Sequence, residues 1–330
     1  MQSKTFFEIF IKSLGGRLLN IKHVIDASNF TLHGSFSKDY QPILTIQPGD
    51  SVQYSTVDIG WGLTERNGKK TEYTSRENEG MLGHPVVGPI EISEARAGMT
   101  LEIKINEIVP SWYGWNCAAG KSNWQNDQLG LSNQEPIRFD WTIDNEKRIA
   151  IGRRNNREFS VPIQPFMGVM ATAPSEPGVH STIPPRYCGG NIDCKELVKG
   201  STLYLPIAVD GALFSVGDGH AAQGDGEVSG QAIECPMELV DLTFYVREEI
   251  YSHMPYANTP AGWITFGFDE DLNKATILAL GGMISLIQQQ YKVSKSEATA
   301  LASVVVDLRI TQIVNQVKGV HAILPHGALR

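Results

Sequence analysis

A glycine-rich segment gathers side chains that could bind a cation. Residues 216–230 read VGDGHAAQGDGEVSG and contain five glycines, with His220, Gln223, Asp225 and Glu227 among them. The pattern H-x-x-x-x-D-x-E combines an imidazole with two carboxylates, which are ligands that a hydrolytic metal site uses. A glutamate that does not hold the metal commonly serves as the general base. The segment therefore predicts a catalytic metal site or, as the alternative, a turn that binds calcium through oxygen ligands.

Three further candidates stand in stretches with the same mixture of glycine and polar side chains. His84 occurs in GMLGHPVVGPI, Asp193 follows a double glycine in YCGGNIDCKEL, and Asp58 ends an expected strand in STVDIGWG. An imidazole or carboxylate at such a place can point into a cleft, but each can equally shape a turn or lie on the surface. We therefore treat them as candidate partners of segment 216–230.

Other catalytic patterns are weaker. The sequence has no GxSxG, HExxH or GxxxxGK[ST] motif. Cys188, beside a double glycine, is a candidate nucleophile with His180 upstream. Nothing in the sequence places a base against it, and free cysteines are most often small buried residues. A cysteine nucleophile is thus the less favoured alternative.

Composition and charge exclude several classes of protein. The 330 residues carry a net charge of −8 without a long basic run, which argues against a nucleic-acid partner. The four cysteines form no CxxC pair, as expected for reduced thiols in a cytoplasmic protein. Glu8 and Lys12 interrupt the apolar start of the chain, so it predicts neither a membrane span nor a secretion signal.

The elements that must position the candidate residues are mostly strands. TLEIKINEI alternates apolar and polar residues, which predicts a strand with one buried face. SVQYSTV, STLYLPIAV and ELVDLTFYV read similarly, with glycine and proline clusters between them. We interpret LYLPIAVDGALFSV as one buried strand, so segment 216–230 is expected to form a glycine-rich turn at its end.

The apolar period becomes helical after about residue 269. DEDLNKATILALGGMISLIQQQY predicts one helix, and SKSEATALASVVVDLRITQIVN opens with a capping box of Ser294 and Glu297. Apolar residues at helical spacing in this second segment are expected to face a core: Leu301, Val304, Val305 and Leu308. The sequence thus predicts an α+β, mainly β fold, a sandwich- or barrel-like body with a C-terminal helical pair packed on it.

We expect three parts along the chain. Residues 1–25 form a lead-in whose order the sequence does not determine. Residues 26–265 form the β-rich catalytic body, with a soft internal boundary near 150–160. Residues 266–330 form an α+β region with the two helices.

The string LFSVGDGHAAQGDGEVSGQAIE resembles the signature of the acetamidase/formamidase family. GHPVVGPI, QPFMGVMATAP, GGNIDCKELVKGSTLYLPI and LASVVVDLRITQIVN are similar to other blocks of that family, in the same order. The resemblance extends from about residue 30 to residue 325. It implies a β-rich, homodimeric or larger enzyme that hydrolyses short-chain amides such as formamide or acetamide to ammonia and a carboxylate. It also implies a divalent metal, with zinc as the first candidate and calcium as the alternative.

The residues of the matching blocks then receive expected roles. We predict metal ligands among four side chains, Asp58, Asp193, His220 and Asp225. Glu227 is expected to take the proton of the attacking water, and His84 to donate to the oxyanion or orient the substrate. The division between ligands and base among the carboxylates stays open.

Three rival interpretations remain at this point. The same scaffold and water chemistry would serve a lactam-opening or other C–N hydrolase, because only the shape of the pocket would differ. A non-enzymatic, calcium-stabilised β-sandwich binding module predicts oxygen-only ligands. A cysteine amidase predicts inactivation by a thiol alkylator and indifference to metal removal.

Overall fold

The structure, a computed structural model, describes residues 20–77, 83–248 and 253–330. The predicted lead-in thus lies outside the described residues up to residue 19. Its last part forms β1 (Lys22–Ile25), which pairs in parallel with β5 (Ser51–Tyr54). Among the described residues, no helix combines the length and the apolar character that crossing a membrane requires.

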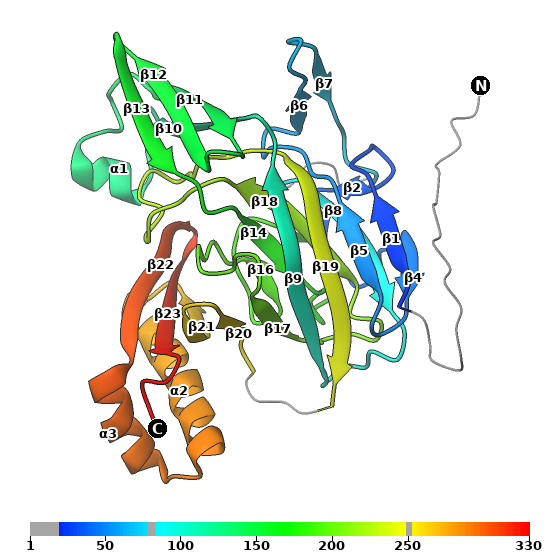
Figure 1. Ribbon diagram of the computed structural model, residues 1–330, viewed down its shortest axis with the longest axis vertical. Helices are drawn as coiled ribbons and strands as arrows, with labels where there is room; N and C mark the ends of the chain where they lie inside the picture. Colours follow the sequence, from blue (N-terminus) through cyan, green and yellow to red (C-terminus); the bar gives the residue numbers. More distant parts are fainter. Residues whose placement is uncertain (1–19, 78–82, 249–252) are drawn as a thin grey trace.

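A nine-stranded sheet forms one layer of the body (Figure 1). In its long strand β9, Leu101, Ile103 and Ile105 are buried and Lys104 is exposed, as the period of two predicts. In spatial order the strands are β1, β5, β19 (Met237–Arg247), β9 (Thr100–Pro110), β17 (Thr202–Pro206), β20 (Tyr256–Thr259), β21 (Gly262–Asp269), β23 (Val317–Pro325) and β22 (Asp307–Asn315). The last strand of the chain, β23, therefore lies between two others and not at an edge.

A six-stranded sheet forms the second layer. Its strands in spatial order are β16 (Gly189–Asn191), β14 (Phe166–Ala171), β18 (Phe214–His220), β8 (Val86–Ile92) and β2 (Leu32–His33), with β4 (Leu44–Ile46) paired in parallel to β8. Apolar residues of both layers form one core, in which the rings of Phe214 and Phe244 lie 5.0 Å apart. The predicted mainly β fold is confirmed as a sandwich, because each of these sheets keeps two edges and closes no barrel in the described part of the chain.

The fold also contains smaller sheets besides the two layers of the sandwich. One has four strands, β10 (Tyr113–Ala118), β11 (Ile137–Asp144), β12 (Ile149–Arg154) and β13 (Arg157–Pro162). Two have two strands each, β3 (Ser35–Phe36) with β15 (His180–Ser181), and β6 (Gly62–Thr64) with β7 (Lys70–Glu72). A short helix, α1 (Trp124–Leu129), follows β10.

The predicted C-terminal helical pair is confirmed. Helix α2 (Leu272–Tyr291) packs Ala275, Ala279 and Met283 against strand β23 of the nine-stranded sheet. Helix α3 (Lys295–Val305) begins with the expected capping box, in which Ser294 accepts from the backbone of Glu297 and the glutamate accepts in return. The local sequence signal therefore located the start of α3 correctly.

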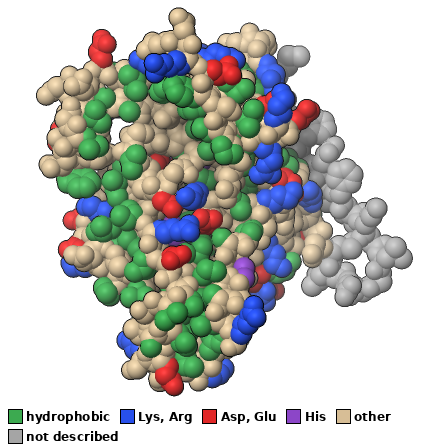
Figure 2. All heavy atoms as spheres, turned by 60° about the vertical axis from the view of Figure 1, so that its left-hand side comes forward, with side chains coloured by type: hydrophobic (Ala, Val, Ile, Leu, Met, Phe, Trp, Pro, Cys, Tyr) green, Lys and Arg blue, Asp and Glu red, His purple; other side chains and the backbone are tan. Residues whose placement is uncertain are grey.

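The end of α3 and part of its expected buried face were predicted wrongly. Leu301 and Val305 pack against the apolar cluster of the helical pair, as expected. The helix ends at Val305, and Leu308 belongs to strand β22, where it is partly exposed. Val304 is 83% exposed instead of facing a core. Three consecutive valines favour extended structure, and the backbone of β22 pairs with β23, with two shifts of register beyond Ile310. Figure 2 shows apolar side chains exposed over the lower part of the molecule, where Figure 1 places α2 and α3.

Candidate active site

The segment expected to form a turn continues as a strand through His220. LYLPIAVDGALFSV is not one strand but contains β17, a connection and the start of β18. A Cβ at Gly217 would lie 2.2 Å from the carbonyl oxygen of Pro85, so only glycine lets that backbone lie directly over β18. This close approach brings His84, which precedes β8, next to Asp218 of β18.

His220 lies between two groups of carboxylates. Its Nε2 is 3.2 Å from Asp218 Oδ1 and 3.2 Å from Glu234 Oε2. Its Nδ1 is 3.9 Å from Asp193 Oδ1. One atom each of Asp193, His220 and Glu227 lie within 4.8 Å of one another, and so do atoms of Asp218, His220 and Glu234. We call these five residues the His220 cluster.

Gly168 of β14 makes room for the cluster. The register of β14 with β18 places it opposite Asp218, because Met167 pairs with Gly219 and Val169 with Gly217. A Cβ there would lie 2.5 Å from Asp218 Oδ2 and 2.6 Å from Asp193 Oδ1. Two carboxylates therefore occupy the space that any side chain at this position would fill.

Neighbouring amides hold Asp193. The Nδ2 of Asn315 donates to Asp193 Oδ2, and the Nε2 of Gln223 donates to the Asp193 backbone oxygen at 2.8 Å. Asp193, Asp218 and Glu227 all have positive φ angles, of 53°, 60° and 47°. Strained backbone of this kind persists where the surrounding structure determines it and is concentrated at functional sites.

The His220 cluster is almost completely removed from solvent. Its side chains are at most 6% exposed. His84, whose Nδ1 is 3.2 Å from Asp218 Oδ2, has a side chain that is 21% exposed and forms the open side of the cluster. Four carboxylates face two imidazoles, so two negative charges stay unbalanced even when both imidazoles are protonated. Burying such a charge without a counter-ion is unfavourable, which makes this a place for a divalent cation.

The pKa values reflect this excess of carboxylates. Burial, only partly offset by His220, raises the pKa of Asp193 to about 7, and burial together with Asp193 raises the pKa of Glu227 well above its usual range. Burial alone would raise the pKa of Asp218, but the imidazoles of His220 and His84 outweigh it and lower that pKa. Burial alone would lower the pKa of His84, but nearby carboxylates, foremost Asp218, raise it to about 9. Asp218 thus has positively charged partners, whereas the positive charge beside Asp193 and Glu227 is too small to offset their burial.

Comparison with known proteins identifies the relatives of this arrangement. The profile of the Acetamidase/Formamidase family matches residues 19–181 and 176–327. The chain belongs to the acetamidase/formamidase family. The crystal structure of an acetamidase from Bacillus halodurans is 29% identical with a TM-score of 0.77, and the match covers 91% of this chain and 97% of that one.

Local matches to curated relatives in the acetamidase/formamidase family are closer in sequence but short. An acetamidase from Mycolicibacterium smegmatis is 50% identical and a formamidase from Methylophilus methylotrophus 52% identical, each over 48 residues. Each match covers 14% of this chain and spans only 12% of the relative. These matches support the family.

The structure brings together some of the residues that the sequence singled out. Asp193, His220 and Glu227 meet in the cluster, and His84 lies at its open side through Asp218. Neither of the two metal-ligand groups found among the described residues contains Asp58 or Asp225.

Local partners explain why Asp58 and Asp225 stay outside these groups. Asp58 accepts a hydrogen bond from the backbone of Gly60 at 2.8 Å and one from the hydroxyl of Tyr113, so it shapes a turn. Asp225 forms an ion pair with Lys195 at 3.1 Å, and its side chain is partly exposed. Both carboxylates thus have partners before any cation is considered.

Sequence reasoning missed Asp218, Glu234 and Asn315. Asp218 stood in the quoted segment, but a Gly-Asp-Gly string is also ordinary turn chemistry. Glu234 reaches the cluster because its backbone forms a bridge with His220, and nothing in its sequence spacing indicates that contact. Recognising that GDGH continues strand β18 would have been the one usable signal for Asp218.

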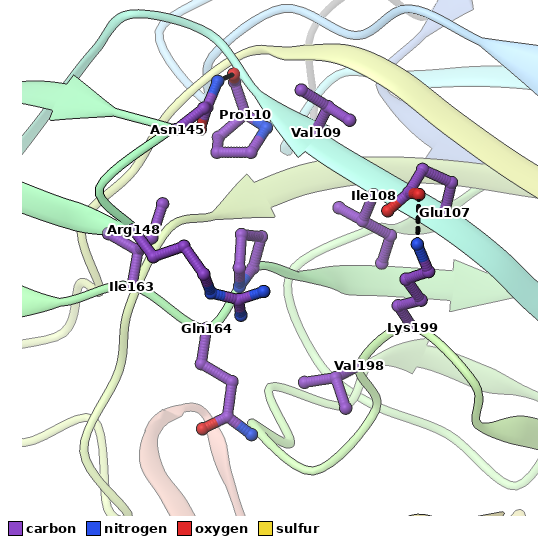
Figure 3. A pocket seen from close by; sticks show the side chains of 11 residues that line it. Glu107, Ile108, Val109, Pro110, Asn145, Arg148, Ile163, Gln164, Val198 and Lys199 are labelled. Atoms are coloured by element: carbon purple, nitrogen blue, oxygen red, sulfur yellow. Dashed lines mark hydrogen bonds and ion pairs between the residues drawn. The ribbon is translucent and has the colours of Figure 1, made fainter.

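A groove of about 420 Å³ lies beside this region without belonging to it (Figure 3). Its Gln164 donates a backbone hydrogen bond to Ala221, the residue after His220. The groove is lined by apolar side chains such as Ile108 and by the ion pair of Lys199 with Glu107, and it contains no member of the His220 cluster. The catalytic residues of this acetamidase/formamidase fold are therefore expected in the His220 cluster and not in the groove.

Proposed function

We propose that this chain hydrolyses short-chain aliphatic amides to ammonia and a carboxylate, using a divalent metal held by Asp193, His220 and Glu227. Membership of the acetamidase/formamidase family supports the reaction. The observation that supports a bound metal is the cluster itself, in which these three buried residues converge around one point.

The donor set fits a metal in two ways. Asp193 Oδ1, His220 Nδ1 and Glu227 Oε2 are buried and have no hydrogen-bond partner among the described residues, although buried polar atoms are normally paired. One imidazole and two carboxylates are also the kind of three-ligand set that keeps a catalytic zinc site open for a fourth partner. The imidazole favours a transition metal over calcium, which prefers oxygen ligands alone.

Asp218 completes this arrangement by contacting the second ring nitrogen of His220. Metal-binding histidines usually donate their other ring N–H to a carboxylate, which fixes the tautomer and the ring orientation. His220 Nε2 and Asp218 Oδ1, 3.2 Å apart and hydrogen-bonded, provide that contact. Phe166 holds the same ring from the side, edge to face at 5.0 Å.

The chemistry then divides among the residues of the chain. A bound divalent metal lowers the pKa of water and polarises a carbonyl group. His84, held by Asp218 at the open side, donates a hydrogen bond to the amide oxygen as negative charge develops there. The carbonyl carbon gains the hydroxyl group of water, the C–N bond breaks, and the proton that water gives up goes to the nitrogen, which leaves as ammonia. We place Glu227 with the ligands and no longer with the base, because it belongs to one of the two ligand groups and has a buried oxygen without a partner among the described residues.

Removing the metal should abolish turnover. We expect purified protein to contain a stoichiometric transition metal by elemental analysis, and to lose ammonia release from formamide and acetamide after dialysis against a strong chelator. Adding back zinc should restore the activity, because the folded ligand set remains. Turnover that persists without metal would contradict the metal mechanism, and loss of activity to a thiol alkylator instead would favour a cysteine nucleophile.

The substrate range is tested with the same assay. A panel of formamide, acetamide, propionamide and a small lactam separates a linear amidase from a lactam-opening enzyme, because the two differ in pocket shape. Ring opening faster than release of ammonia from every linear amide would overturn the proposed substrate class. A protein that binds calcium alone and releases no ammonia would be the binding module.

Replacing Glu227 by Gln should lower metal content and turnover together. The amide of glutamine keeps the shape of the side chain but loses the charge that a metal ligand contributes. Elemental analysis and ammonia release, measured on the same preparation, check this. Full metal content with turnover reduced by about 10²-fold or more would instead make Glu227 the general base.

A further inference from the structure

Asn315 controls which oxygen of Asp193 is available to the cluster. A carboxylate only accepts hydrogen bonds, so the contact from Asn315 Nδ2 occupies Oδ2. The other oxygen, Oδ1, points toward His220 and is buried, without a hydrogen-bond partner in the part of the chain that the structure describes. Asn315 itself is 7% exposed, so water does not compete strongly for its amide.

Strand β22 delivers Asn315 to this position through its own buried contacts. The Oε1 of Gln312, which is fully buried, accepts from the backbone N–H groups of Val314 at 2.8 Å and of Asn315 at 3.1 Å. These bonds fix the bend at the end of the strand from which the Asn315 side chain projects.

The same strand also holds the segment that carries Glu227. The N–H of Gly226 donates to the carbonyl of Thr311 at 3.0 Å, and the N–H of Ile313 donates back to the carbonyl of Gly226 at 3.2 Å. Two members of the proposed ligand set, Asp193 and Glu227, are therefore positioned by one C-terminal strand that contributes no ligand of its own.

We infer that Asn315 is a positioning residue, which orients the carboxylate of Asp193 toward His220 and thereby sets the affinity of the cluster for its metal. This inference rests on the proposed function only for the identity of the bound cation. The orientation of Asp193 is a property of the protein itself. Groups that orient a metal ligand in this way typically contribute 10- to 100-fold, that is about one to two orders of magnitude, in metal affinity.

The test compares Asn315→Leu with a matched control. Leucine keeps the branching of asparagine at Cγ but removes the donor. The control is Asn106→Leu, which breaks an equivalent contact of an asparagine with a carboxylate, Asp241, at 2.9 Å in the nine-stranded sheet. We expect Asn315→Leu to weaken Co²⁺ binding by roughly 10- to 100-fold in competition with a chelator, and to change the visible absorption of bound Co²⁺. Asn106→Leu should leave both unchanged.

A crystal structure of metal-free Asn315→Leu decides the inference without any bound cation. We expect the Asp193 carboxylate to rotate, so that Oδ1 no longer faces His220 Nδ1. An unchanged carboxylate would overturn the inference, and so would equal Co²⁺ affinity in wild type and variant. Wild-type protein that binds no metal and releases no ammonia would instead refute the proposed function, while the rotation of Asp193 would still support the positioning role.

Discussion

Replacing His220 by Ala should remove both the bound metal and the amide turnover. His220 is the residue that the two ligand groups share, so its loss leaves carboxylates without the imidazole that links them. A metal contributes several kcal/mol of transition-state stabilisation, and losing it should lower turnover by at least about 10³-fold. Elemental analysis and ammonia release from formamide measure the two effects.

A second buried histidine provides the control for this experiment. His33 is as buried as His220 and lies in the same sheet. Its Nε2 forms a hydrogen bond of 2.9 Å with the hydroxyl of Ser215, which lies on strand β18 like His220. His33→Ala should lower the free energy of unfolding but keep the metal and most of the turnover per folded molecule. If His220→Ala behaves like His33→Ala, the cluster is structural and the proposed site is wrong.

Adding one methyl group at Gly168 should have a comparably large effect. In Gly168→Ala the new Cβ would lie within 2.6 Å of carboxylate oxygens of both Asp193 and Asp218. Contacts this short force the carboxylates apart, and a displacement of about 1 Å at a reacting centre can cost about 10²-fold in rate. We expect at least that loss of turnover, together with weaker metal binding in a chelator competition.

The matched substitution for Gly168→Ala is Gly281→Ala in helix α2. No atom lies within 4 Å of a Cβ built at Gly281, and alanine favours the helix by roughly 0.5–1 kcal/mol. Gly281→Ala should therefore keep full activity and unfold at a slightly higher temperature in a thermal melt. Wild-type turnover in Gly168→Ala would show that the packed carboxylates are not needed in their present places.

The sequence predicted the fold best where the signal was local. Alternation in β9 and the capping box at Ser294 both report contacts between residues close in the chain, and both are confirmed. Helix α3 was extended too far because its apolar spacing resembles that of the following strand. What ends the helix is the pairing of β22 with β23, which no local pattern contains.

Candidate residues of the site, too, could be found where the sequence signal was local. Glycine-rich context marked Asp193, His220 and Glu227 as candidates, and the structure brings them together. The same context marked Asp225, whose partner Lys195 becomes apparent only in space. Glu234 could not be found, because a bridge between separate backbone segments determines its contact with His220.

The place of β23 in the nine-stranded sheet has a consequence for how the protein is made. Until residues 317–325 leave the ribosome, β21 keeps an unpaired edge and β22 lacks its partner strand. A nascent chain therefore carries an open template for strand addition, at which it can associate wrongly with another chain or be bound by a chaperone. Since Asn315 lies at the end of β22, the pairing that closes this edge also fixes the strand that carries the contact to Asp193.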